Sequence, residues 1–121
     1  MQTQKSLTNY PKRGEIFIVD LNPGLGREIH KKRPCLVISG NVANTQSPHV
    51  VIIPVSSQIP KLIGMEMILV GKTEGLAKRS VVLPLYIRSI DQNRLVKKIG
   101  EISKNKLEEV EEALRLILDL Y

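Results

Sequence analysis

The sequence has little cysteine and few aromatic residues: one Cys, no Trp, and Phe, Trp and Tyr together at 3% of 121 residues. A single Cys35 cannot form an internal disulfide, and no Cys/His cluster has the spacing of zinc ligands. No apolar run approaches the ~20 residues of a membrane-spanning helix. Residues 1–6 lack the apolar core of a signal peptide. These absences predict a cytoplasmic protein, and the scarcity of aromatics argues against a base-stacking sheet.

What is present is a globular composition with a basic excess. Apolar residues make up 42% and charged residues 25%, with a net charge of +6. Residues 1–61 hold eight Lys or Arg against three Asp or Glu, so most of the excess lies in the first half. A basic excess in one half of a single domain indicates a polyanionic partner, with nucleic acid the first candidate.

Hydrophobic patterning predicts a polar N-terminal arm over residues 1–10 and a single domain over 11–121. Within the domain, residues 40–48 read as a polar loop and residues 91–94 as a short capped turn. Runs of β-branched and apolar residues predict six strands, at 15–21, 34–39, 49–56, 65–70, 80–85 and 96–102. Several of these strands are apolar on both faces, which favours a homodimer that buries the surplus.

One convincing helix is predicted, over residues 104–120, with Ser103 as its N-cap. Its apolar residues fall at steps of three and four, which gives one buried stripe. The acids Glu108, Glu109, Glu111 and Glu112 are expected on a solvated outer face. The fold class is therefore α+β and β-dominated, and a small bent barrel would remove exposed strand edges.

The densest charge lies in residues 27–33, between the first two strands: Arg27, Glu28, His30, Lys31, Lys32 and Arg33. Arg33 precedes Pro34, which restricts its backbone to extended geometry, and a positioned guanidinium binds phosphate with two hydrogen bonds. His30 titrates near neutral pH and is an acid or base candidate. The charge alone is equally compatible with a basic loop that has no specific ligand.

The order of short motifs along residues 12–120 resembles the MazF/PemK/Kid toxins of toxin–antitoxin systems. The resemblance begins with Arg13-Gly14-Glu15-Ile16 and Asp20-Leu21-Asn22-Pro23. It continues through residues 26–28, 33–38, 47–48, 55–58, 75–82 and 87–91.

The resemblance implies an SH3-like β-barrel with a C-terminal α-helix, acting as a homodimer. Members of this family cleave single-stranded RNA at short sequences without a metal ion or cofactor, leave a 2′,3′-cyclic phosphate and a 5′-OH, and so inhibit translation and growth. A cognate antitoxin protein with an acidic or disordered C-terminal segment neutralises them by covering the RNA groove.

By the same resemblance, three residues are candidates for catalysis. Arg33 matches the catalytic arginine of the family, where a fixed cation would stabilise the phosphorane and protonate the leaving oxygen. Ser56 falls where the family has a catalytic Thr or Ser, although a serine at a strand end also commonly caps a turn. Glu28 matches an acidic position and would take the 2′-OH proton or orient Arg33, unless it is a solvated loop acid.

The candidates for RNA binding are Arg27, His30, Lys31, Lys32, Tyr86 and Arg88. The sequence departs from the family at Leu85 and Tyr86, where many members carry an acid–Gln or Asp–Gln pair. Leu85 cannot hydrogen-bond a base, whereas Tyr86 can stack on one. This departure keeps a second function open, a non-catalytic RNA-binding or topoisomerase-inhibiting protein on the same fold. His49 is predicted to be a strand-boundary residue, and Cys35 a buried, small apolar residue.

Overall fold

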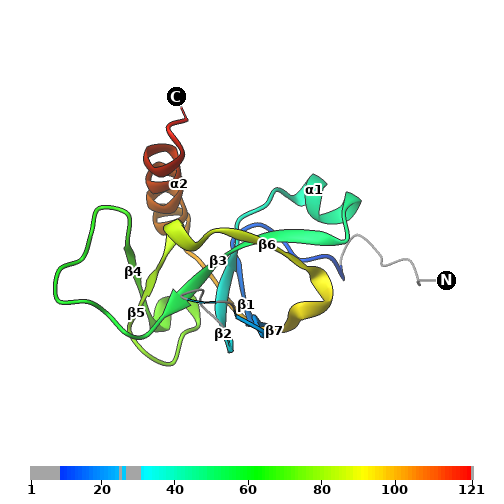
Figure 1. Ribbon diagram of the computed structural model, residues 1–121, viewed down its shortest axis with the longest axis horizontal. Coiled ribbons are helices and arrows are strands. Elements are labelled where there is room, and N and C mark those ends of the chain that lie inside the picture. Colours follow the sequence, from blue (N-terminus) through cyan, green and yellow to red (C-terminus); the bar gives the residue numbers. More distant parts are fainter. Residues whose placement is uncertain (1–8, 25, 27–30, 121) are drawn as a thin grey trace.

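The computed structural model describes residues 9–24, 26 and 31–120 of the chain. Seven strands are followed by one long C-terminal helix, which stands beside the strands (Figure 1). The strands are β1 (Glu15–Asp20), β2 (Lys32–Val37), β3 (His49–Ser56), β4 (Ile68–Val70), β5 (Ser80–Val82), β6 (Arg88–Asp91) and β7 (Leu95–Glu101). The helices are α1 (Asn41–Gln46) and α2 (Lys104–Leu118), with short 3-10 turns η2 (Lys72–Glu74), η3 (Pro84–Tyr86) and η4 (Gln92–Arg94).

The strands are arranged in the order β4-β5-β3-β2-β1-β7, with β6 pairing β3 outside this path, and all pairs are antiparallel. The sheet curls into a half-barrel, so the α+β, β-dominated class is confirmed (Figure 1). Beyond the strand pairs, η2 lies against β7: a Cβ added at Gly100 would be 2.0 Å from the carbonyl oxygen of Glu74. The segment after β4 therefore contacts the strand at the other end of the order.

The curled sheet buries apolar side chains on both of its faces. On β2, Leu36 belongs to a cluster with β3, β4, β5 and α2, whereas Cys35 and Val37 belong to a second cluster with β1, β3 and β6. All three are fully buried. The two-faced apolar strands from which a homodimer is predicted thus find partners within one chain, and the dimer needs a separate argument.

Several boundaries differ from the sequence predictions. β2 begins at Lys32, so Arg33 lies in a strand and not at the end of a loop. The ladder between β2 and β3 runs from Cys35 to Val37, which leaves Pro34 just outside it, where a missing N–H is tolerated. The fourth and fifth strands are shorter than predicted, because the turn in which Met67 N–H donates to the Gly64 carbonyl precedes β4, and Pro84 begins η3 soon after β5. β6 was not predicted.

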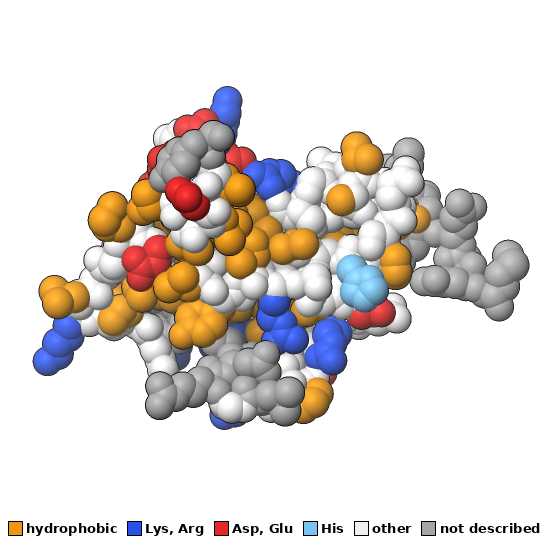
Figure 2. Space-filling view, turned by 45° about the horizontal axis from the view of Figure 1, so that its top comes forward, with side chains coloured by type: hydrophobic (Ala, Val, Ile, Leu, Met, Phe, Trp, Pro, Cys, Tyr) orange, Lys and Arg blue, Asp and Glu red, His pale blue; other side chains and the backbone are white. Residues whose placement is uncertain are grey.

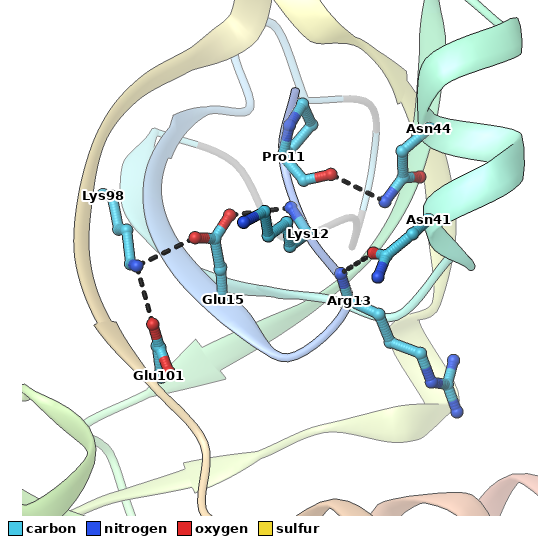
Figure 3. Close-up of polar contacts among 8 residues, drawn as sticks. All are labelled: Pro11, Lys12, Arg13, Glu15, Asn41, Asn44, Lys98 and Glu101. Atoms are coloured by element: carbon cyan, nitrogen blue, oxygen red, sulfur yellow. Dashed lines mark hydrogen bonds and ion pairs between the residues drawn. The ribbon is translucent and has the colours of Figure 1, made fainter. Parts of the chain in front are cut away.

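The polar segment predicted as a loop contains α1, and tertiary hydrogen bonds explain why. The Asn44 side chain is fully buried and its Nδ2 donates to the carbonyls of Pro11, at 3.0 Å, and Ser39, at 3.1 Å. The Arg13 N–H donates to Asn41 Oδ1 at 2.8 Å (Figure 3). These partners are distant in sequence, so a count of polar residues cannot reveal them.

On the outside of the sheet, Lys98 of β7 contacts two carboxylates. Its Nζ lies 2.7 Å from Glu101 and 2.8 Å from Glu15 of β1 (Figure 3). The hydrogen bonds to Glu101 and then Glu15 raise the pKa of Lys98, and the bond from Lys98 lowers the pKa of Glu101. These groups are exposed, so their effect on stability is small.

Helix α2 begins as predicted and ends two residues earlier. Ser103 Oγ accepts the N–H of Lys106 at 3.2 Å, which confirms the N-cap. Val110 is buried, with Leu107 and Leu114 packed against the same cluster. Glu111 is not on a solvated face: it forms an ion pair with Arg13. Among the described residues no helix is long and apolar enough to cross a membrane.

Candidate functional site

The predicted catalytic arginine lies on the face of β2 that carries the second core cluster. Arg33 is half-buried and pairs with Val19 of β1. On the other side of β2, Cys35 pairs with Pro54 of β3. Continuing this antiparallel register by two residues brings Arg33 opposite Ser56, and directly opposite residues share a face. The strand pairing thus juxtaposes a guanidinium and a hydroxyl that lie 23 residues apart in the sequence.

Ser56 is the last residue of β3 and is half-buried. Its Oγ accepts the backbone N–H of Gln58 at 3.1 Å, so it caps the turn that follows the strand. A serine hydroxyl that accepts one hydrogen bond still has its own proton to donate. The turn contact therefore fixes the side chain and leaves an O–H for a phosphate oxygen.

Arg88 adds a second cation to this face. It opens β6 and pairs with Ile52 of β3, a member of the same core cluster as Cys35. Burial raises the pKa of the Cys35 thiol to about 12, although the positive charges of Arg33 and Arg88 act in the opposite direction. Both guanidiniums are therefore close enough to Cys35 for their fields to reach it. The prediction that Cys35 is a buried apolar residue is confirmed, since a neutral thiol is not nucleophilic.

Tyr86 lies at the exposed edge of the same region. It ends η3, two residues before Arg88, and is 45% exposed, while its neighbour Leu85 is 60% exposed. The N–H of Leu83 donates to the Pro54 carbonyl at 3.0 Å, which ties the start of this turn to β3. An exposed aromatic ring held between β5 and β6 provides a flat surface on which an unpaired base could stack.

The basic connection between β1 and β2 is described only at its ends. Lys31 and Lys32 are exposed, and Lys32 pairs with Asp20. Arg27, Glu28 and His30 lie outside the described residues. His49 is exposed and opens β3, which confirms its prediction as a boundary residue.

Two residues beside the site were missed by the sequence reasoning. Asn22 Oδ1 accepts the N–H of Lys31 at 3.0 Å, and Nη1 of Arg94 donates to the carbonyls of Asn22 and Asp20. Asn22 was assigned only to a turn, and Arg94 only to the capped segment after Asp91. Contacts across more than 70 residues have no signature in a single sequence.

The electrostatics of the site are dominated by cations. Figure 2 shows Lys and Arg side chains lying together near the middle of one face, with hydrophobic side chains around them. Within the described part of the chain, no group of three or more His, Cys, Asp or Glu side chains is placed to hold a metal ion. A half-buried arginine, a fixed hydroxyl and a second arginine form a set of hydrogen-bond donors that suits a phosphodiester.

Known proteins share both the sequence and the fold. The family model of PemK-like, MazF-like toxins of type II toxin–antitoxin systems matches residues 12–118. The chain is 36% identical over 115 residues to the endoribonuclease MazF9 of Mycobacterium tuberculosis, covering 91% of this chain and 98% of that protein. It is 34% identical over 110 residues to the endoribonuclease EndoA of Bacillus subtilis, covering 90% and 95%. The crystal structure of MazF from Deinococcus radiodurans superimposes with a TM-score of 0.79 at 27% identity, covering 92% and 98%.

Proposed function

Since this chain belongs to the family of PemK-like, MazF-like toxins of type II toxin–antitoxin systems, we propose that it is an endoribonuclease toxin whose reacting centre is formed by Arg33 and Ser56. The observation that carries the proposal is the β2–β3 register, which extends to place Arg33 opposite Ser56. Arg88 supplies a second positive charge on the same face.

The proposed reaction is an internal transfer in single-stranded RNA that needs no metal ion. The 2′-oxygen attacks the adjacent phosphorus as its proton leaves, and the bond from phosphorus to the 5′-oxygen breaks. The products are a 2′,3′-cyclic phosphate and a 5′-OH. Three tasks follow: removal of the 2′ proton, stabilisation of charge on the phosphorane, and a proton for the leaving oxygen.

The side chains divide these tasks according to their chemistry. Arg33 stabilises the charge and donates a proton to the 5′-oxygen, since a guanidinium is always protonated and is a poor base at neutral pH. Ser56 donates its O–H to a phosphate oxygen, because its Oγ is already fixed by Gln58. Glu28 is proposed, from the family resemblance, to accept the 2′ proton or to orient Arg33.

RNA binding is assigned to the cations around the centre and to one aromatic ring. Arg27, His30, Lys31 and Lys32 are proposed to contact the phosphate backbone, with Arg88 between them and Tyr86. Tyr86 is proposed to stack on a base. Because Leu85 offers no hydrogen bond where relatives often carry a polar residue, the RNA sequence preferred by this chain should differ from theirs.

The proposed partners are RNA, a second copy of the chain and a cognate antitoxin, and the proposed location is the cytoplasm. The antitoxin follows from the family, whose members are toxins of type II toxin–antitoxin systems. An acidic or disordered antitoxin segment would complement the net charge of +6. The homodimer rests on the family resemblance, together with exposed apolar side chains that include Leu62, Met65 and Leu116.

The test compares wild-type protein with Arg33→Ala in digestion of a long RNA in the presence of EDTA. We expect wild-type cleavage to persist and Arg33→Ala to lose about 10²- to 10³-fold in rate. Arg115→Ala is the charge-matched control, because Arg115 lies exposed on α2, bonded only to Glu112 among the contacts described. Cleavage of equal rate in Arg33→Ala would contradict the assignment, and RNA binding without turnover by wild type would favour a non-catalytic protein.

A further inference from the structure

The two ends of the connection between β1 and β2 are joined by hydrogen bonds centred on Asn22. The N–H of Leu21 donates to the Lys31 carbonyl at 3.0 Å, and the N–H of Lys31 donates to Asn22 Oδ1 at 3.0 Å. The N–H of Asn22 in turn donates to Asp20 Oδ1 at 3.0 Å. The chain that enters the connection is therefore tied to the chain that leaves it, two residues before Arg33.

A distant arginine completes this arrangement. Arg94 ends η4 and is half-buried, and its Nη1 donates to the Asp20 carbonyl at 3.1 Å and to the Asn22 carbonyl. These carbonyls belong to the same two residues whose side chains accept the N–H groups of Asn22 and Lys31. We call the set Asp20, Asn22, Lys31 and Arg94 the clasp.

The clasp holds a backbone conformation that would otherwise be unfavourable. Lys31 has φ of 72°, in the left-handed region that residues other than glycine seldom adopt. Such a conformation persists only where surrounding contacts determine it, and here both the N–H and the carbonyl of Lys31 are bonded. Since Lys31 directly precedes β2, its conformation sets the direction in which the strand carrying Arg33 begins.

We propose that Arg94 is a positioning residue for Arg33: it fixes the carbonyls of Asp20 and Asn22, and through Asn22 and Lys31 it fixes the start of β2. The proposal rests on the proposed function only for the role of Arg33. A competing role for Arg94 is direct contact with an RNA phosphate. Its bonds to two backbone carbonyls argue against that role, since a donor satisfied by the protein gains little from a phosphate.

The experiment uses Arg94→Ala and Arg94→Lys, with Arg115→Ala as the matched loss of one positive charge. Cleavage is measured as the single-turnover rate at saturating RNA. Binding is measured over a range of salt concentrations with an RNA whose 2′-OH groups are methylated, so that it cannot form a cyclic phosphate. We expect Arg94→Ala to cut the rate by about 10- to 100-fold, the range that small misplacements of a reacting group produce. Affinity should change less than about 3-fold with an unaltered salt dependence, and Arg94→Lys should recover part of the rate.

A readout that requires no activity is the hydrogen exchange of the Lys31 and Leu21 amides, followed by NMR. We expect both to exchange faster in Arg94→Ala than in wild type, while amides of β3 keep their rates. Asn22→Ala, which removes the acceptor for Lys31, should accelerate exchange of Lys31 and slow cleavage similarly. If Arg94→Ala does not fold, Arg94→Lys and Asn22→Ala carry the same comparison.

Two results would overturn the proposal. One is a slope of log affinity against log salt that falls by about 0.7 in Arg94→Ala with the cleavage rate unchanged, as loss of one phosphate contact to single-stranded RNA would give. The other is slowed cleavage with unchanged exchange of Lys31. If instead Arg33→Ala cleaves normally, the proposed function fails, while faster Lys31 exchange in Arg94→Ala would still show that the clasp exists.

Discussion

Cys35 shows how a single residue at the site is governed by its surroundings. It lies within the field of two arginines, which favour a thiolate, yet complete burial outweighs them and keeps the thiol protonated. The loss of hydration on burial costs an ion more than two cations at a distance return. Cys35 therefore supports Arg33 and Arg88 as a packed apolar side chain and takes no part in chemistry.

The pKa of Cys35 predicts how stability depends on pH. The folded-state value of about 12 stands above the ordinary value of 9.0. Below pH 9 the thiol is protonated in both states and its contribution is fully present. Above pH 9 the unfolded chain ionises first, so the contribution falls by about 1.4 kcal/mol per pH unit until the folded value is reached.

The measurement is urea unfolding at pH 8, 9, 10 and 11 for wild type and Cys35→Ala. Taking the difference between the two cancels the titration of lysines and tyrosines. We expect the stability difference between them to shrink steadily above pH 9. A constant difference up to pH 11 would show that the Cys35 thiol ionises as easily in the folded protein as in the unfolded chain.

At the level of elements, Arg13 anchors α2 to the start of the sheet. Its Nη1 donates to the Ile38 carbonyl after β2, and its Nη2 forms the ion pair with Glu111 on α2. The side chains of this pair are 32% and 30% exposed, whereas those of Arg115 and Glu112, within the helix, are 51% and 72% exposed. The pair that joins two elements is thus the better shielded from water.

A double-mutant cycle measures this difference. For Arg13→Ala and Glu111→Ala we expect a coupling of about 1 kcal/mol in urea unfolding, near the upper end for partly exposed pairs. The control cycle, Arg115→Ala with Glu112→Ala, should give about 0.3 kcal/mol, because both side chains are solvated and lie on the same helix. Equal couplings in the two cycles would mean that Arg13 does not anchor the helix through Glu111.

The elements that could be predicted from the sequence are those whose signal is local. The unbroken β-branched run of β3 gave the observed bounds, and Ser103 correctly marked the start of α2. α1 was missed because the buried contacts of Asn44 stabilise it from outside. β6 was missed because it is short and pairs with β3 across about 40 residues. The same limit applies to the site: Arg33 and Ser56 were proposed singly, but their juxtaposition depends on a strand register.

For the whole molecule, the contact between η2 and β7 brings the two ends of the strand order together without a ladder of hydrogen bonds. Gly75 and Gly100 allow the two backbones to touch: a Cβ at Gly75 would lie 2.3 Å from the Ile99 carbonyl oxygen. At Gly100 the obstructing atoms are the Glu74 carbonyl and the Cα of Gly75, all backbone, so no side chain can move aside. The curvature of the half-barrel therefore depends on two glycines.

Gly100→Ala tests this dependence. The added methyl group must displace backbone, and we expect a loss of about 3 kcal/mol in the free energy of unfolding, as for severe overpacking. Gly40→Ala is the control, since a Cβ there meets nothing within 4 Å, and it should cost less than about 1 kcal/mol. Similar stabilities of the two variants in urea unfolding would show that the backbones are free to separate.

Arg33 lies in β2, whereas much of the basic charge precedes it in the sequence. The consequence is a division of labour that favours diversification. A strand paired with both neighbours keeps its reacting group in place while the residues between Asn22 and Lys31 change in identity or number, so substrate preference can drift without loss of catalysis. An engineer would use the same property: exchanging that connection between relatives, with Asn22, Lys31 and Arg94 retained, should retarget cleavage and leave its chemistry intact.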